Sequence, residues 1–254
     1  MAPARLIDRL HPRALRFAWQ RLRLAHAGIK VSTDGPLTRL GGWCVDLTML
    51  GRNSVIYSFG VGTDVEWELE LIARVGAEIH AFDPTPMSRA WIERQRLPRE
   101  FRFYPLGISN REGELLLHPP RRPDDPHFSQ DRMSGTKVSA GSVACPVSTL
   151  GAIARNLGHR RIDILKLDVE GSEFDCVPDL LASGVEIGQL LVEVHYRNPG
   201  RTIDDGIGLL RSILAAGFIC TSMSERALEF SFIHPAAKMR APRRNAGEAV
   251  TPRP

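Results

Sequence analysis

The fold is decided by the stretch Tyr57-Ser-Phe-Gly-Val-Gly-Thr-Asp64. A short run of strand-forming residues, Ser54–Phe59, leads into it, and a helical period over residues 64–75 follows it. Glycines at such a junction let the backbone turn tightly and approach a ligand closely. A strand, a glycine turn and a helix in this order predict the first unit of a parallel α/β sheet.

The same alternation continues along the chain. The expected strands are Ala77–Phe82, Phe101–Leu106, Ile162–Leu167 and Gln189–Val194, and the expected helices are 87–96, 149–157, 173–183 and 204–216. Two last strands, Phe218–Ser222 and Leu228–Ile233, are too close for a parallel crossover and must form an antiparallel hairpin. We therefore predict a Rossmann-like α/β fold, with a mostly parallel sheet, a terminal antiparallel hairpin and helices on both faces.

The glycine turn also predicts a cofactor site. Val65 replaces the third glycine of the dinucleotide pattern GxGxxG, and the glutamates at 66, 68 and 70 would repel a pyrophosphate but not a cationic sulfonium. Asp83 ends the next strand, where an acid accepts hydrogen bonds from ribose hydroxyls, although it could instead cap the turn at Pro84. We expect cofactor contacts from Gly60, Gly62, Asp64, Asp83, Pro84 and Gly107.

A second motif, Asp163-Ile-Leu-Lys-Leu-Asp-Val-Glu-Gly-Ser-Glu173, runs from a buried strand into a carboxylate-dense turn. Asp168, Glu170 and Glu173 follow the carboxyl end of that strand, where ligands bind in open α/β sheets. Lys166 could pair with one of these acids. The structural alternative is capping of the next helix by Glu170 or Ser172.

With these motifs and with Phe82-Asp-Pro-Thr-Pro86, the chain resembles the FkbM family of methyltransferases over about residues 40–234. The resemblance implies a class I methyltransferase fold and S-adenosylmethionine as the cofactor. It also implies, in most members, O-methylation of a hydroxyl on a sugar, glycan or natural product. The acceptor itself is not specified by these motifs.

Glu193 and His195 end the strand that should lie beside the strand ending at Asp168, and their side chains share one side of it. We predict that Asp168, Glu193 and His195 converge. His195 is then a candidate general base for a hydroxyl acceptor, since its pKa lies near neutrality. Alternatively, the three residues could hold a divalent cation that lowers the pKa of a coordinated hydroxyl, or form a purely structural pair.

Two other functions are compatible with a Rossmann-like fold. An NAD-linked oxidoreductase predicts a third glycine and no terminal hairpin, and both expectations disagree with the sequence. A non-catalytic nucleotide-binding scaffold predicts loss of Asp168 or His195, and both residues are present.

Charge and composition divide the chain into three parts. Residues 1–30 carry a net charge of +6 and residues 236–254 one of +4, which leaves residues 31–235 with −6. The acidic domain does not indicate nucleic-acid binding. We expect a basic amphipathic helix within 1–30, broken near Pro12, a catalytic domain over 31–235, and a disordered tail from 236. The helix could pack on the domain or on a second subunit, or make peripheral membrane contact through residues 13–27.

Three further expectations concern the remaining features. The polar stretch 118–142 could select the acceptor through Asp131, Arg132, Ser134, Thr136 and Lys137, or be a solvated loop. The four cysteines match no zinc motif and should be reduced core residues. Without a signal sequence or an apolar span, the chain is expected to be cytoplasmic.

Overall fold

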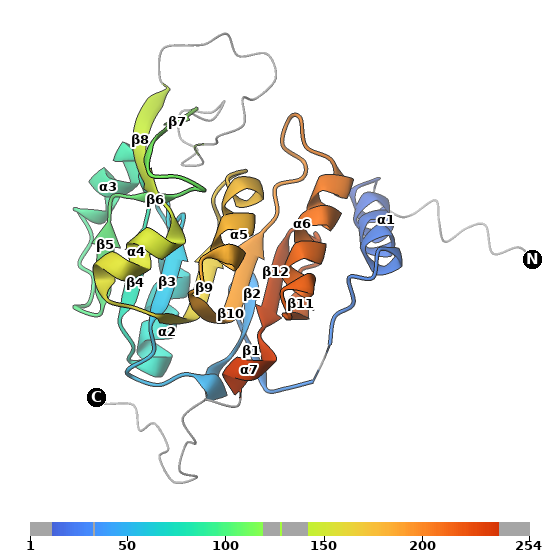
Figure 1. The fold of residues 1–254 in the computed structure, drawn as a ribbon, viewed down its shortest axis with the longest axis horizontal. Helices are drawn as coiled ribbons and strands as arrows, with labels where there is room; N and C mark the ends of the chain where they lie inside the picture. The colour runs from blue at the N-terminus through green and yellow to red at the C-terminus, as the bar shows by residue number, and fades with distance from the viewer. Residues whose placement is uncertain (1–11, 33, 119–127, 129–141, 239–254) are drawn as a thin grey trace, which may run out of the picture.

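A computed structural model describes residues 12–32, 34–118, 128 and 142–238. The main feature of this part of the chain is a seven-stranded sheet (Figure 1). Its order is β11-β12-β10-β9-β3-β4-β5. The strands are β3 (Ile56–Phe59), β4 (Ile79–Phe82), β5 (Phe101–Tyr104), β9 (Arg161–Leu167), β10 (Glu186–Glu193), β11 (Ile219–Met223) and β12 (Glu229–Ile233). Strands β5, β4, β3, β9 and β10 are parallel, whereas β12 is antiparallel to both β10 and β11. The predicted parallel sheet with its terminal hairpin is confirmed.

Helices cover both faces of this sheet, as predicted. They are α2 (Glu66–Val75), α3 (Pro86–Ile92), α4 (Leu150–Leu157), α5 (Glu173–Ala182) and α6 (Ile203–Ala215). Because side chains alternate along a strand, Tyr57 and Phe59 pack with apolar residues of α4, α5 and α6, whereas Ile56 packs with those of α2. Helix α3 ends at Ile92, short of the predicted end at residue 96.

A hairpin that the sequence analysis did not predict precedes β3. It consists of β1 (Leu37–Leu40) and β2 (Trp43–Asp46), followed by the short 3₁₀ helix η3 (Leu47–Met49). Leu40, Trp43 and Val45 join the same apolar cluster as α2, so the hairpin covers part of that face of the sheet. Each strand has only four residues, too few for an alternating pattern to stand out.

A second sheet, also not predicted, lies after β5. Its order is β6-β8-β7, with β6 (Gly107–Ile108), β7 (Gly113–Leu117) and β8 (Val143–Ser148). Strands β7 and β8 are antiparallel and are joined by the polar stretch 118–142. The candidate acceptor residues Asp131, Arg132, Ser134, Thr136 and Lys137 lie outside the described residues.

The N-terminal and C-terminal segments of the chain differ in part from the structure predicted for them. Helix α1 (Pro12–His26) begins at the proline where a break was predicted, and it lies beside α6 at one end of the molecule (Figure 1). It packs on the domain through Leu24 and Gln20, whereas Leu15, Trp19 and Leu22 are exposed. The predicted tail begins with a helical turn, α7 (Pro235–Lys238), in which Ala237 is buried. Residues 1–11 and 239–254 lie outside the described residues.

Three of the four cysteines are core residues as predicted, whereas Cys44 is only partly buried. All four are free, and Cys145, Cys176 and Cys220 are buried. Within the described ranges, no helix combines the length and the apolar character needed to cross a membrane.

Candidate active site

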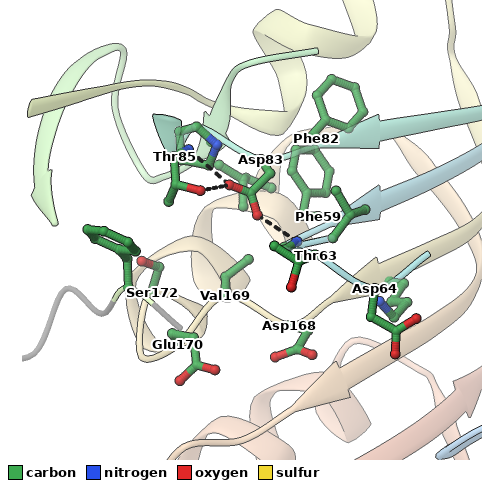
Figure 2. Close-up of a pocket in the computed structure, with 18 of the residues that line it drawn as sticks. Phe59, Thr63, Asp64, Phe82, Asp83, Thr85, Asp168, Val169, Glu170 and Ser172 are labelled. Atoms are coloured by element: carbon green, nitrogen blue, oxygen red, sulfur yellow. Dashed lines mark hydrogen bonds between the residues drawn. The ribbon is translucent and has the colours of Figure 1, made fainter. Parts of the chain in front are cut away.

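A cavity of about 370 Å³ lies at the carboxyl ends of β3, β4 and β9 (Figure 2). Its walls include the glycine turn 60–64, residues 83–85 after β4, and residues 168–170 after β9. The six residues predicted to contact a cofactor all line it, namely Gly60, Gly62, Asp64, Asp83, Pro84 and Gly107. The strand order therefore gathers into one cavity residues that are spread over half of the domain.

Gly60 and Gly62, two glycines of the turn, are favoured at their positions for different structural reasons. Gly60 has a φ of +81°, and a Cβ placed on it would lie 1.6 Å from the carbonyl oxygen of Asp168. Only glycine allows β3 to pass this close to the backbone after β9. Gly62 has a φ of +55°, but a Cβ placed on it would have no atom within 4 Å, so only its backbone conformation favours glycine.

Asp83 fixes the shape of the turn. One carboxylate oxygen accepts a hydrogen bond from the Gly62 backbone N–H at 2.9 Å, and the other accepts from the backbone N–H and the hydroxyl of Thr85 (Figure 2). The residue is only 5% exposed. Asp83 thus has the capping role that remained an alternative in the sequence analysis. A carboxylate offers about four acceptor sites, so one remains for a ligand.

A buried ion pair forms another wall of the cavity. The ammonium of Lys166 lies 3.4 Å from Glu68 Oε1, which also accepts a hydrogen bond from Ser58. The same ammonium lies 5.9 Å and 5.5 Å from the ring centroids of Trp43 and Trp67. Burial alone would lower the pKa of Lys166, but the charges of Glu68 and Asp168 outweigh it and raise that pKa, so the lysine stays charged.

We expect Lys166→Met to lower the free energy of unfolding by about 3–5 kcal/mol, because it leaves the Glu68 carboxylate buried without its partner. The double variant Lys166→Met with Glu68→Gln should recover most of this loss in urea denaturation. As a control on the same helix as Glu68, Arg74→Ala removes the exposed pair with Glu70 and should cost no more than about 0.5 kcal/mol. A double variant no more stable than the single one would contradict the assignment.

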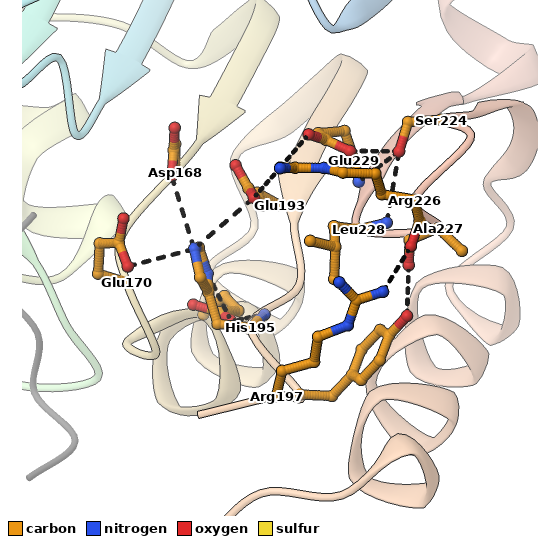
Figure 3. Close-up of polar contacts among 12 residues, drawn as sticks. Asp168, Glu170, Glu193, His195, Arg197, Ser224, Arg226, Ala227, Leu228 and Glu229 are labelled. Atoms are coloured by element: carbon orange, nitrogen blue, oxygen red, sulfur yellow. Dashed lines mark hydrogen bonds and ion pairs between the residues drawn. The ribbon is translucent and has the colours of Figure 1, made fainter. Parts of the chain in front are cut away.

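The three predicted catalytic residues do converge, at the carboxyl ends of β9 and β10 (Figure 3). Ligand atoms of Asp168, Glu193 and His195 all lie within 4.8 Å of one another. The Nε2 atom of His195 is 3.9 Å from Asp168 Oδ1, 3.9 Å from Glu193 Oε1 and 3.4 Å from Glu170 Oε2. We call these four residues the carboxylate–histidine cluster.

Glu173, the first residue of α5, orients the histidine. Its side chain is fully buried, and Oε1 lies 2.6 Å from the His195 backbone N–H and 3.2 Å from Nδ1. A carboxylate can only accept here, so Nδ1 must carry the proton. Nε2 therefore faces three carboxylates, and it must carry either a second proton or a cation to be stabilised there.

The electrostatics differ from the sequence-based interpretation, which gave His195 a pKa near neutrality. Burial lowers that pKa, but the hydrogen bond to Glu173 and the charges of Glu173, Glu170 and Glu193 outweigh it and raise it to about 10. Burial and the charge of Asp168 raise the pKa of Glu193 to about 8. In the absence of a cation, His195 is thus protonated at neutral pH and cannot accept a proton.

These shifts predict that stability falls as the pH rises. The stabilisation from His195 is complete below its unfolded pKa of 6.5 and is lost as the pH approaches 10, and ionising Glu193 above its unfolded pKa of 4.5 adds a cost. We expect the free energy of unfolding to drop by a few kcal/mol between pH 6.5 and about pH 10 with a chelator present. In the double variant with Glu193→Gln and His195→Gln, the free energy of unfolding should change much less over this pH range. A wild-type stability that rises over this window would contradict the assignment.

Sequence reasoning missed the roles of Glu68 and Glu173. Glu68 looked like one of several acids that suit a helix start, yet it is 1% exposed and pairs with Lys166. Its spacing four residues before Ile72, on the buried face of α2, was the available signal. For Glu173, no pattern in the sequence indicated a hydrogen bond to a strand end 22 residues away.

Similarity to known proteins extends over most of the sheet and the cavity. The family model described as "Methyltransferase FkbM domain" matches residues 57–220. "Probable methyltransferase-like protein 24" of Homo sapiens is 32% identical over 148 residues, which are 57% of this chain and 33% of the human protein. The Rattus norvegicus protein of the same name is also 32% identical over 148 residues, 57% of this chain and 34% of its own length. The chain thus spans about a third of the length of these relatives.

Among solved structures, a Pyrococcus horikoshii protein named as a candidate transferase aligns with 88% of this chain and 63% of its own. The TM-score is 0.31 and the identity 10%.

Proposed function

This chain belongs to the FkbM methyltransferase family, and on that premise we propose that it transfers a methyl group from S-adenosylmethionine to a hydroxyl of a sugar, glycan or natural-product acceptor. The two relatives named methyltransferase-like match this chain over only about a third of their own length. The methyl donor and the acceptor are therefore both parts of this proposal.

The charge of the cavity is the main observation that favours S-adenosylmethionine over NAD as the cofactor. Among its described lining residues are one lysine, Lys166, and six carboxylates, at positions 64, 66, 68, 83, 168 and 170. Such a cavity favours a ligand with a positive centre and disfavours a dinucleotide, whose pyrophosphate is anionic. Its volume, about 370 Å³, lies in the range of small-molecule sites. The residues present therefore fit S-adenosylmethionine better than NAD.

The chain's own residues have distinct tasks in this proposal. Asp83 and the backbone of Gly60 and Gly62 would hold the ribose end of the cofactor, because Asp83 keeps one acceptor site free after fixing the turn. Asp168 and Glu170 line the cavity and also face His195, so they connect the cofactor site with the carboxylate–histidine cluster. The bound cofactor supplies an electrophilic methyl group on a sulfonium.

Acceptor activation would fall to the cluster. A hydroxyl must lose its proton as its oxygen attacks the methyl carbon, and a carboxylate beside it can receive that proton. With a pKa of about 8, Glu193 would accept the proton in its ionised form, which becomes populated as the pH approaches 8. The protonated His195 would hold the neighbouring carboxylates in place and neutralise part of their charge.

Calorimetric titration with S-adenosylmethionine, S-adenosylhomocysteine and NAD tests the choice of cofactor. We expect both methionine-derived ligands to bind and NAD to bind weakly or not at all. Tight binding of NAD alone would overturn the proposal. Release of S-adenosylhomocysteine over a panel of monosaccharides, glycans and hydroxylated natural products then tests the acceptor class.

A divalent cation held by Asp168, Glu193 and His195 is the second candidate for the cluster. The observation that favours it is the Nδ1 bond to Glu173, which directs Nε2 at carboxylate oxygens in the arrangement typical of histidine ligands. Mn²⁺ or Mg²⁺ should then raise the melting temperature of the wild type but not of Glu193→Gln. If the two proteins respond equally, the cluster does not bind the metal.

A further inference from the structure

Helix α1 turns its apolar side away from the protein. Leu24 is completely buried and Gln20 is 5% exposed, whereas Leu15, Trp19 and Leu22 are 43%, 50% and 69% exposed. A surface helix usually does the opposite and packs its apolar stripe against the core. Among the described residues, five large apolar side chains are exposed, and three of the five lie on this one helix.

Polar contacts hold the helix in this orientation. The guanidinium of Arg21 donates to the backbone carbonyl of Ser224 at 3.0 Å, and that of Arg197 donates to the side chain of Gln20. Leu24 belongs to the main apolar cluster of the domain. The outward apolar face is therefore fixed in place by contacts on the opposite face of the helix.

The exposed residues form a continuous strip, which we call the α1 stripe: Leu15, Trp19 and Leu22. Their spacing of four and three residues puts them on one side of a helix. The same period places Arg16 and Arg23 along one border of the strip. Arg16 is exposed, while Arg23 forms an ion pair with Asp204.

We propose that the α1 stripe docks this protein on an anionic lipid bilayer, with Trp19 at the level of the headgroups. Aromatic and leucine side chains on one face, together with neighbouring arginines, are typical of helices that lie in the membrane interface. The first 30 residues add a net charge of +6, which complements anionic lipid.

A second copy of the chain fits the stripe less well. Symmetric pairing would bring two arginine-rich helices together, and like charges at such an interface oppose association. Helix α1 has 15 residues and is about 22 Å long, so one face of it offers far less than the roughly 800 Å² per partner of a stable interface.

Vesicle flotation tests the proposal with the full chain. Wild type should float with phosphatidylcholine vesicles that contain phosphatidylserine, and much less with phosphatidylcholine alone or at high salt. The variant Leu15→Ser, Trp19→Ser, Leu22→Ser should bind the anionic vesicles at least roughly tenfold more weakly. Ile219→Ser is the matched control, because Ile219 is 45% exposed on the edge strand β11 and should not change binding.

Tryptophan fluorescence reports whether the stripe itself enters the lipid. The emission should shift to shorter wavelength on binding, and Trp19→Phe should still float but lose this shift. Circular dichroism of the serine variant verifies that it is folded. Wild type that does not float, or a serine variant that floats equally well, would overturn the proposal. So would light scattering that shows a wild-type dimer which the serine substitutions dissolve, since the stripe would then be a self-association surface.

Discussion

Replacing Gly60 with alanine is expected to leave little or no folded protein. The added Cβ would lie 1.6 Å from the carbonyl oxygen of Asp168, and both partners are backbone at the centre of the sheet, between β3 and the turn after β9. Neither can move without breaking the parallel ladder that joins these strands. The φ of +81° adds a backbone cost of about 1–2 kcal/mol.

The total loss should exceed about 4 kcal/mol, a large part of the stability of an ordinary domain. Soluble yield, circular dichroism and thermal denaturation measure it. Gly62→Ala is the matched control, because this glycine also has a positive φ but nothing within 4 Å of the new methyl group. It should cost about 1–2 kcal/mol and remain folded. Equal stabilities of the two variants would show that the close approach of Asp168 is not the constraint.

Replacing His195 with alanine is expected to reduce methyl transfer by about 10²–10⁴-fold while leaving affinity for S-adenosylmethionine nearly unchanged. His195 is absent from the described lining of the cavity, so cofactor binding should not need it. Turnover should need it, because it organises Asp168, Glu170 and Glu193 through Nε2. The readouts are S-adenosylhomocysteine release with an acceptor found in the panel, and cofactor affinity by calorimetry.

Two further variants make this experiment specific. His195→Asn keeps an N–H donor near the position of Nδ1 for the buried Glu173 and separates lost chemistry from lost stability. His234→Ala removes a histidine that follows β12 and contacts Phe218, remote from the cluster, and should leave turnover unchanged. Full activity of His195→Ala would exclude His195 both as a cation ligand and as the residue that organises the carboxylates of the cluster.

The carboxylate–histidine cluster shows where prediction from sequence reached its limit. That Asp168, Glu193 and His195 would meet followed from strand order, since neighbouring parallel strands end at the same edge. The protonation of His195 did not follow. It depends on Glu173 and Glu170, whose carboxylates are brought to the ring by the turn into α5, and on how deeply the group is buried.

The sequence by itself determined the alternation of strands and helices, the terminal hairpin, and the glycine turn together with Asp83, Pro84 and Gly107 as cavity residues. These features are local, because periodicity, glycine and strand-end acids act over a few neighbouring residues. Tertiary structure alone decided the rest. It packs the β1–β2 hairpin against α2, buries Glu68 beside Lys166, and turns Leu15, Trp19 and Leu22 outward. Each of these outcomes depends on contacts between segments that are far apart in the chain. A local sequence pattern does not by itself specify the partner in such a contact.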